Sequence, residues 1–218
     1  MRKKIQNLYL FFSSLLKLNI TKSILIQFKI KSNNWRRFPV LLYGKSSFSI
    51  HSTASINIIS GKFIFNDGRQ KFEPFFGFLK MEKNSKLNVK GAFTVYSGGH
   101  IILAKDANIN LGSGYINRNV KIRCFKSICI GENVAISENV TIWDSDVHEM
   151  VREGYVNTAP INIGNHVWIG TGVIILKGVS IGDNSIISAG SVVSRSVPAN
   201  CLAAGNPAKI IKRNVSWK

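Results

Sequence analysis

The chain has 218 residues, of which 45% are hydrophobic and 18% are charged. This length suits one globular domain with a short appendage, and the high aliphatic content excludes an intrinsically disordered chain. Lysine and arginine outnumber aspartate and glutamate by 29 to 11, which gives a formal net charge of +18. Both ends are basic, since no acidic residue precedes Asp67 and none follows Asp183. We therefore expect the ends to attract anions, such as lipid headgroups, nucleic acid, an acidic glycan or a phosphorylated cofactor.

The three cysteines, Cys124, Cys129 and Cys201, lack the even number and the spacing of a disulfide framework or a structural zinc site. They favour a reducing compartment, so we expect a cytoplasmic protein. The longest uninterrupted apolar runs fall well short of the roughly 20 residues that a membrane-crossing helix needs. A basic start followed by apolar residues is also typical of a signal peptide, but Lys17 interrupts that region and no small-residue cleavage site follows. We therefore do not expect secretion.

Residues 1–45 are predicted to form a basic N-terminal segment with a short amphipathic helix. Its apolar residues recur at helical spacing on one stripe: Ile5, Leu8, Phe12, Leu15 and Leu16. Such a helix can contact an anionic membrane at the inner face, and it can equally pack on its own domain. Thr21 could cap a second helix, although Ile26, Phe28 and Ile30 alternate with polar residues as in a strand. The sequence leaves both pairs of alternatives open.

A six-residue repeat dominates the second half of the chain. Aliphatic residues return without a slip at Ile163, Ile169, Ile175, Ile181, Ile187 and Val193, and the same spacing joins Ile130, Ile136 and Ile142. Less regular repeats extend upstream through Leu87. An α-helix cannot keep a six-residue period on one face, whereas a short strand followed by a corner can. The repeat predicts a mainly β protein, a parallel β-helix of stacked coils over residues 46–208.

The repeat breaks after Ile142, in the run Trp143-Asp144-Ser145-Asp146-Val147-His148. The six-residue period predicts the next inward aliphatic residue at position 148, but that residue is His148. Because the repeat resumes only at Ile163, residues of about 148–160 are predicted to leave the prism as one extruded loop. An imidazole at the root of this loop lies where rigid coils meet a flexible segment, which is a good place for a reactive group.

Side chains alternate in an extended segment, so Asp144, Asp146 and His148 are expected on one face. A carboxylate beside an imidazole fixes its tautomer and stabilises its protonated form, which suits a general base. The alternative is a histidine that only forms hydrogen bonds at a loop root, with aspartates that cap a turn. These residue types also suit a metal, but no third histidine lies at a neighbouring coil position, so we expect no metal.

Trp168 directly precedes the inward-facing Ile169 and is therefore expected to face outward. A solvated coil usually carries a polar residue at such a position. An outward aromatic ring can form one wall of a ligand groove, and it can also be covered by a partner subunit or by the loop.

The stretch from Ile130 to Lys212 resembles the hexapeptide-repeat acyltransferases, which are left-handed parallel β-helices that use acetyl-CoA. The resemblance rests on ordered motifs: Asp144-Ser145-Asp146-Val147-His148, Pro160-Ile161-Asn162-Ile163-Gly164, Gly182-Asp183-Asn184-Ser185 and Ala203-Ala204-Gly205-Asn206-Pro207-Ala208-Lys209. The irregular upstream coils are similar to the branch that O-acetylates bacterial surface glycans such as capsule and lipopolysaccharide. The resemblance implies an acetyl-CoA-dependent O-acetyltransferase of a sugar or glycan hydroxyl, acting in polysaccharide biosynthesis. It also implies a homotrimer, with no nucleic acid as partner.

The same resemblance assigns roles to individual residues. His148 matches the general base of the family, Asp146 would orient it, and Asp144 is a second candidate beside the active groove. Trp168 matches the tryptophan next to that groove. Positions that line the CoA groove or approach its phosphates match Thr171, Ala189, Ser194, Lys209 and Lys212. The two lysines lie within a predicted basic C-terminal tail at 209–218. The alternative to phosphate binding is that they belong to an ordinary solvated surface.

Three other functions stay open at this point. The first is N-acetylation of an amino sugar or a small antibiotic. The second is a zinc carbonic-anhydrase-like enzyme, which the missing histidine set disfavours. The third is a non-catalytic β-helix, which would show a regular repeat without a loop rooted in Asp-x-Asp-x-His.

Overall fold

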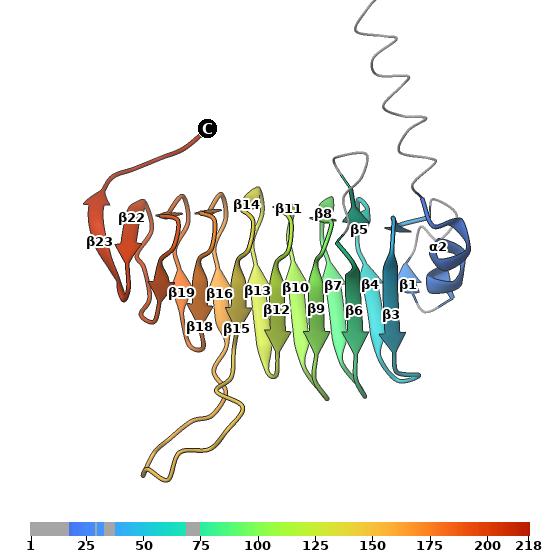
Figure 1. Ribbon diagram of the computed structural model, residues 1–218, viewed down its shortest axis with the longest axis horizontal. Coiled ribbons are helices and arrows are strands. Elements are labelled where there is room, and N and C mark those ends of the chain that lie inside the picture. Colours follow the sequence, from blue (N-terminus) through green and yellow to red (C-terminus); the bar gives the residue numbers. More distant parts are fainter. Residues whose placement is uncertain (1–17, 29, 33–37, 69–74) are drawn as a thin grey trace, which may run out of the picture.

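The computed structural model describes residues 18–28, 30–32, 38–68 and 75–218. Within these residues the chain forms helix α2 (Ile20–Gln27) and then a long prism of stacked coils. Figure 1 shows the strands as parallel rows along the prism, with one loop projecting from it. The predicted helical stripe from Ile5 to Leu16 lies outside the described residues.

Three sheets form the sides of the prism, and we number them in the order in which the chain first reaches them. Sheet 1 consists of β1 (Ile30–Ser32), β4 (Ser55–Ile58), β7 (Lys86–Val89), β10 (Asn108–Leu111), β13 (Ser127–Ile130), β16 (Ile161–Ile163) and β19 (Ser180–Ile181). Sheet 2 consists of β2 (Val40–Leu42), β5 (Phe63–Asp67), β8 (Phe93–Tyr96), β11 (Gly114–Ile116), β14 (Val134–Ile136), β17 (Trp168–Ile169), β20 (Ile186–Ile187), β22 (Cys201–Gly205) and β23 (Ala208–Arg213). Sheet 3 consists of β3 (Ser46–Ile50), β6 (Gly77–Met81), β9 (His100–Leu103), β12 (Lys121–Cys124), β15 (Thr141–Trp143), β18 (Ile174–Leu176) and β21 (Val192–Val193).

The chain visits the three sheets in turn up to β21, so each coil lies on the preceding one. Neighbouring strands within a sheet are parallel, and the exception among the described strand pairs is the antiparallel pair β22–β23. The fold is a left-handed parallel β-helix, which confirms the fold class predicted from the repeat and the resemblance.

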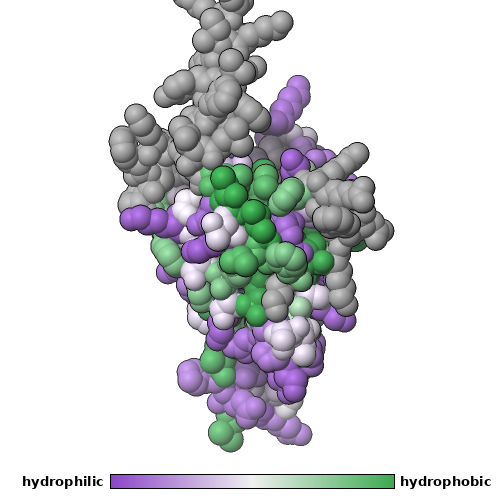
Figure 2. Space-filling model, turned by 90° about the vertical axis from the view of Figure 1, so that its right-hand side faces the viewer, coloured by the Kyte–Doolittle hydropathy of each residue, from purple (hydrophilic) through white to green (hydrophobic). Residues whose placement is uncertain are grey.

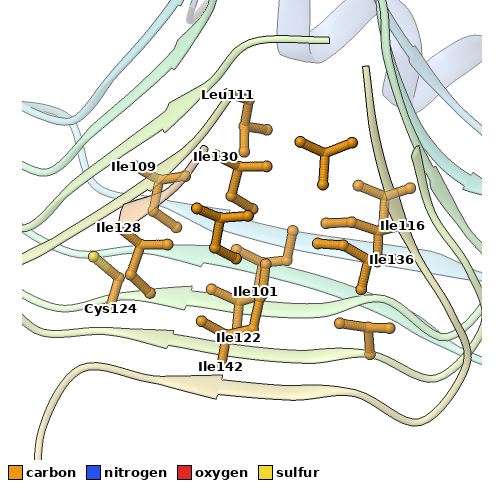
Figure 3. Packing of buried hydrophobic residues seen from close by; sticks show 14 of the residues in the cluster. Ile101, Ile109, Leu111, Ile116, Ile122, Cys124, Ile128, Ile130, Ile136 and Ile142 are labelled. Carbon is orange, nitrogen blue, oxygen red and sulfur yellow. The ribbon is translucent and has the colours of Figure 1, made fainter. Parts of the chain in front are cut away.

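The six-residue repeat supplies the core of the prism. The aliphatic series from Ile163 to Val193 is at most 3% exposed. Parallel pairing stacks equivalent residues, so that Ile163 lies beside Ile130 on one side and Ile181 on the other. In Figure 3, Ile128, Ile136 and Ile122 point inward from the three different sheets. Each such side chain contributes about 1.5–3 kcal/mol on burial, and only stacked coils can provide that burial.

The corners of the coils depend on residues that tolerate a left-handed backbone. Asn139, Asn184 and Asn200 have φ values of 59°, 60° and 57°, and asparagine adopts this region more readily than most residues. The side chain of Asn184 also donates from Nδ2 to Oδ1 of Asn200, at 3.1 Å, in the next coil. Glycine serves where corners touch, since a Cβ at Gly131 would lie 2.6 Å from the carbonyl oxygen of Gly164.

Two predicted boundaries differ from the observed ones. The β-helix begins before residue 46, because β1 and β2 already pair with β4 and β5. The basic tail predicted at 209–218 is partly a strand, because β23 continues to Arg213 and pairs with β22. Both alternatives for residues 21–30 hold in part: α2 ends at Gln27 and β1 begins at Ile30. The helix cap is Asn19 rather than Thr21, since Oδ1 of Asn19 accepts the backbone N–H of Lys22 at 3.1 Å.

Helix α2 lies at the N-terminal end of the described prism. Its buried residues, Ser23 and Ile26, face the prism, where the backbone N–H of Leu42 donates to Oγ of Ser23 at 3.0 Å. Its outer side leaves Ile24, Leu25 and the following Phe28 exposed. Figure 2 looks onto this end, where hydrophobic residues gather on the surface. In the described part of the chain, no helix has the length and apolarity needed to cross a membrane.

Candidate active site

One long loop interrupts the regular coils at the edge between sheets 3 and 1. Strand β15 ends at Trp143 and β16 begins at Ile161, and the chain between them projects from the prism, as Figure 1 shows. A bridge between Ser145 and Thr158 closes the neck of the loop. The predicted loop is therefore present, and it begins a few residues before the predicted start at 148.

His148 lies on this loop with an exposed side chain. A tight turn precedes it: the backbone N–H of His148 donates to the carbonyl oxygen of Asp146 at 2.7 Å, and that of Val147 donates to Oγ of Ser145 at 2.9 Å. Val147 has a φ of 65°, which is strained for a β-branched residue and costs about 1–3 kcal/mol. The turn directs the imidazole away from the inward position that the repeat would have given it.

Asp144 does not share a face with His148, so that expectation is wrong. Its side chain is fully buried, and its carboxylate accepts the backbone N–H groups of residues 125–127 at 2.6, 2.8 and 2.9 Å. Its own carbonyl oxygen accepts the N–H of Ala159 at 3.0 Å. Burial raises the pKa of Asp144, although the three N–H groups oppose that rise. Asp144 therefore joins the preceding coil to both ends of the loop and is not part of an open groove.

Asp146 is exposed, but its described contacts are not with the imidazole of His148. Its carboxylate lies 2.5 Å from Nζ of Lys177 and accepts a hydrogen bond from the hydroxyl of Tyr155. Nζ of Lys177 also lies 4.4 Å from the centroid of the Tyr155 ring. We call Asp146, Tyr155 and Lys177 the loop clasp. No sequence signal pointed to Tyr155 or Lys177, because one lies in the irregular loop and the other at an ordinary coil corner.

The loop clasp has consistent electrostatics. The hydrogen bond from Lys177, followed by that from Tyr155, lowers the pKa of Asp146. In return, the hydrogen bond to Asp146 raises the pKa values of Lys177 and Tyr155. At neutral pH the clasp therefore holds one carboxylate, one ammonium group and one neutral phenol.

Trp168 faces outward from sheet 2, as predicted, with 42% of its surface exposed. Its ring centroid lies 6.1 Å from that of Trp217. Trp217 stacks on His166 with centroids 4.4 Å apart and an interplanar angle of 12°, and its Nε1 donates to the carbonyl oxygen of His166 at 2.7 Å. The C-terminal residues therefore return to sheet 2 beside Trp168. Trp217 lies outside the repeat, and no pattern in the sequence pointed to it.

The five residues expected at a cofactor groove are exposed but do not form a single group. Thr171 and Ala189 lie at neighbouring corners between sheets 2 and 3, where the N–H of Gly190 donates to the carbonyl oxygen of Thr171 at 2.8 Å. Ser194 follows β21 at the far side of sheet 3. Lys209 and Lys212 lie on β23, paired with Ala204 and Leu202 of β22.

His148 and Trp168 lie on different sides of the prism in one chain. The loop leaves the edge between sheets 3 and 1, and sheet 2, which carries Trp168, is the side opposite that edge. A cavity of about 600 Å³ within the loop is lined by Glu149, Met150, Val151, Arg152, Glu153, Tyr155 and Asn157, and by neither of these two residues. Within the described part of one chain, this cavity does not bring the two side chains together.

The described residues contain no group of three or more His, Cys, Asp or Glu side chains placed to hold a metal ion. The three cysteines are free thiols, and burial raises the pKa of Cys124 far above its ordinary value. The described side chains thus provide an exposed imidazole and an exposed indole, with cationic and hydroxyl groups along the prism.

Comparison with known proteins agrees with this fold. A family model described as "Bacterial transferase hexapeptide (six repeats)" matches residues 160–195. This stretch is therefore similar to the hexapeptide repeats of bacterial transferases. It contains Trp168, Thr171 and Ala189, and it begins where the loop returns to the prism.

Two curated relatives cover more of the chain. Galactoside O-acetyltransferase of Escherichia coli K12 is 44% identical over 110 residues, which are 49% of this chain and 54% of that protein. Polysialic acid O-acetyltransferase of Escherichia coli O1:K1 is 38% identical over 144 residues, which are 64% of this chain and 44% of that protein. The chain thus spans about half the length of the curated relatives it matches. A solved galactoside acetyltransferase in complex with coenzyme A is 32% identical, with 68% of this chain and 64% of that chain covered and a TM-score of 0.40.

Proposed function

We propose that the protein is an acetyl-CoA-dependent O-acetyltransferase that acetylates a hydroxyl of a sugar or bacterial surface glycan. The observation that carries this proposal is the exposed imidazole of His148, on the one long described loop that interrupts the hexapeptide coils. The activities for which the relatives are named, O-acetylation of galactosides and of polysialic acid, support the same reaction. Such an enzyme serves polysaccharide biosynthesis in the cytoplasm, where acetyl-CoA is available.

In the proposed reaction, His148 acts as the general base. Its imidazole takes the proton from the acceptor hydroxyl while the hydroxyl oxygen attacks the thioester carbonyl carbon of acetyl-CoA. A carbon–oxygen bond forms, the carbon–sulfur bond breaks, and the CoA thiolate leaves with the proton from the imidazolium. His148 suits this role because its side chain is exposed, and an imidazole nitrogen can accept a proton and then donate it.

We assign Asp146 a positioning role. Through Lys177 and Tyr155 it holds the two arms of the loop together, and its own carbonyl oxygen accepts the N–H of His148 at 2.7 Å. Asp144 has a structural role, because its carboxylate fixes the root of the loop to the preceding coil. Neither aspartate needs to touch the substrate in this scheme.

We propose that the complete site forms between copies of the chain in a homotrimer. His148 of one copy and Trp168 of the next would then face the same groove, which one chain alone does not provide. Acetyl-CoA would run along the coil corners past Thr171, Ala189 and Ser194. Lys209 and Lys212, exposed on β23, would meet its phosphates.

The test is acetyl transfer, followed by release of the free CoA thiol with a galactoside or a sialic acid oligomer as acceptor. His148→Ala should lower kcat by about 10²–10⁴-fold, as expected for loss of a general base. His51→Ala is the matched control, because His51 is also exposed but directly follows β3, near the N-terminal end of the prism. Equal turnover by the His148→Ala variant and the parent chain would overturn the proposed base.

We also propose peripheral contact between the N-terminal end and an anionic membrane. The exposed Ile24, Leu25 and Phe28 lie in a part of the chain that has no acidic residue before Asp67. Apolar side chains flanked by cations suit the interface of an anionic bilayer. Leu25→Asp should weaken sedimentation with phosphatidylglycerol vesicles. If the variant and the parent chain sediment equally well, α2 does not contact the membrane.

A further inference from the structure

A small cavity of about 250 Å³ opens on the outer face of sheet 3, away from the loop cavity. Its lining residues come from β9, β12 and the segments just before β6, β9 and β12: Phe75, Phe76, Gly98, His100, Asn119, Lys121 and Arg123. These lining residues include two cations and one histidine but no carboxylate.

Arg123 is held in place at the floor of this cavity. Its Nη1 donates to the carbonyl oxygen of His100 at 2.9 Å, and its Nη2 lies 2.5 Å from Nδ1 of His100. The guanidinium carbon also lies 6.0 Å from the ring of Trp143 on the next strand. A fixed guanidinium with further N–H groups to spare can bind a carboxylate or phosphate without a large loss of side-chain entropy.

His100 adds a second fixed donor to the cavity. Because the guanidinium of Arg123 can only donate, Nδ1 of His100 accepts, and the neutral ring carries its proton on Nε2. Burial, followed by the charges of Arg123 and Lys121, lowers the pKa of His100, which favours this neutral form. Phe78 stacks on the ring, with centroids 4.9 Å apart, and restricts its orientation.

The remaining wall is aromatic. Phe75 and Phe76 line the cavity, with 41% and 53% of their surfaces exposed. Exposed aromatic rings pack well against the apolar face of a pyranose ring. A free phosphate ion would use the cations and leave these rings without a partner. An acidic sugar would use both walls.

The cavity lies on the same side of the prism as the root of the loop. Arg123 is the direct neighbour of Trp143 in the pairing of β12 with β15, and Trp143 is followed by Asp144, where the loop begins. Neighbouring strands are about 4.8 Å apart. One or two sugar residues are long enough to span this separation, so a glycan can occupy the cavity while a neighbouring sugar approaches the loop.

We propose that Arg123, Lys121 and His100 form a subsite for the carboxylate or phosphate group of an anionic glycan. The subsite specifies the acceptor of the proposed function. It rests on that function in one respect, namely that the bound glycan is the acetyl acceptor. Phe75 and Phe76 contact the sugar ring, and the anionic group points to Arg123. The acceptor is thereby specified as an acidic glycan rather than a neutral one.

The test is equilibrium binding by titration calorimetry on the full chain without acetyl-CoA. The probes are a trimer of galacturonic acid, a neutral galactose trimer and inorganic phosphate. The acidic trimer should bind at least about tenfold more tightly than the neutral trimer, and added salt should weaken its binding. Arg123→Gln should weaken binding of the acidic trimer about tenfold, and Lys121→Gln should weaken it about threefold, because each variant loses one charge-assisted contact.

Lys86→Gln is the matched control, because Lys86 begins β7 as Lys121 begins β12, with the same exposure pattern, but on sheet 1. Lys121→Gln also covers the case in which Arg123→Gln does not fold. Equal binding of the two trimers, or binding unchanged in both cavity variants, would overturn the subsite. Binding of phosphate without binding of the acidic trimer would overturn the glycan assignment.

This outcome is separable from that of the proposed function. If no acceptor is acetylated although the acidic trimer binds and both cavity variants weaken it, the subsite stands and the acetyltransferase proposal fails. If a neutral acceptor is acetylated and the acidic trimer does not bind, the acetyltransferase proposal stands and the subsite proposal fails.

Discussion

The carboxylate of Asp146 lies 2.5 Å from Nζ of Lys177, so a residue at the start of the loop is tied to the coil that follows the loop. The same Nζ donates to the carbonyl oxygen of Val156, on the returning arm. The N–H of Gly178 adds a bond to the carbonyl oxygen of Ala159 at 3.1 Å. One lysine corner thus holds both arms of the segment that carries His148.

Lys177→Met should loosen this loop without unfolding the prism. Loss of this exposed ion pair releases a tie between the loop and the next coil, so amide hydrogen exchange over residues 147–157 should accelerate about fivefold. In acetyl transfer, kcat should fall because the imidazole of His148 is held less often in a reactive position. The control is Lys105→Met, since Lys105 is paired with Asp106 at 3.9 Å at a corner two coils before the loop. Identical exchange in both variants would contradict the role of the clasp.

The loop should also respond to pH in a defined direction. The folded pKa of Asp146 is lowered, so its contribution is complete above the ordinary aspartate pKa and is lost as pH falls through the lowered value. The folded pKa of Lys177 is raised, so its contribution is complete below the ordinary lysine pKa and is lost as pH rises through the raised value. Proteolysis within residues 148–157 should therefore be slow between about pH 5 and 9 and faster below about pH 4. In Asp146→Asn the acid-side change should disappear.

Asp144 should matter for folding more than for turnover chemistry. Asp144→Ala leaves three backbone N–H groups of residues 125–127 without their acceptor. Since one buried unsatisfied group costs about 1–3 kcal/mol, the variant should lose about 3 kcal/mol or more of unfolding free energy. Asp144→Asn keeps one acceptor oxygen and should lose less. Denaturant unfolding measures both, and a loss below about 1 kcal/mol in Asp144→Ala would show that water replaces the carboxylate.

The aliphatic repeat allows a matched pair of core and surface variants on β18. Ile175 is fully buried and Ile174 is 38% exposed. Ile175→Ala should lower the unfolding free energy by about 2–5 kcal/mol, whereas Ile174→Ala should stay within about 1 kcal/mol of the parent chain. Thermal unfolding followed by circular dichroism distinguishes the two. Equal losses would mean that Ile174 is covered, for example by a second copy of the chain.

The prism could be predicted from the sequence because buried aliphatic residues recur with a fixed period. Burial at every sixth residue is a local pattern, and Ile163, Ile169 and Ile175 display it without reference to the rest of the chain. The break at His148 was visible for the same reason. The upstream start at β1 was missed because its coils are longer and less regular, so their pairing depends on contacts distant in sequence.

The contacts within the site could be predicted less well. The alternation rule placed Asp144 beside His148. Asp144 is the first residue after β15, however, and its carboxylate turns inward to accept the buried N–H groups at the corner of the preceding coil. The rule also paired Asp146 with the imidazole, whereas Lys177 attracts the carboxylate from the next coil. Trp217 reaches Trp168 across 49 residues of sequence, and no local signal encodes such a contact.

The last described strand of sheet 2, β23, closes the stack of coils at the C-terminal end of the prism. A stack of coils can in principle continue indefinitely, because its final rung offers unpaired backbone groups to another molecule. Here β23 turns back antiparallel and presents Lys209, Lys212 and Arg213 on an exposed rung, so a second molecule adding there would meet concentrated positive charge. At the other extremity of the described prism α2 packs on β2, so neither end of the described stack is an open parallel rung.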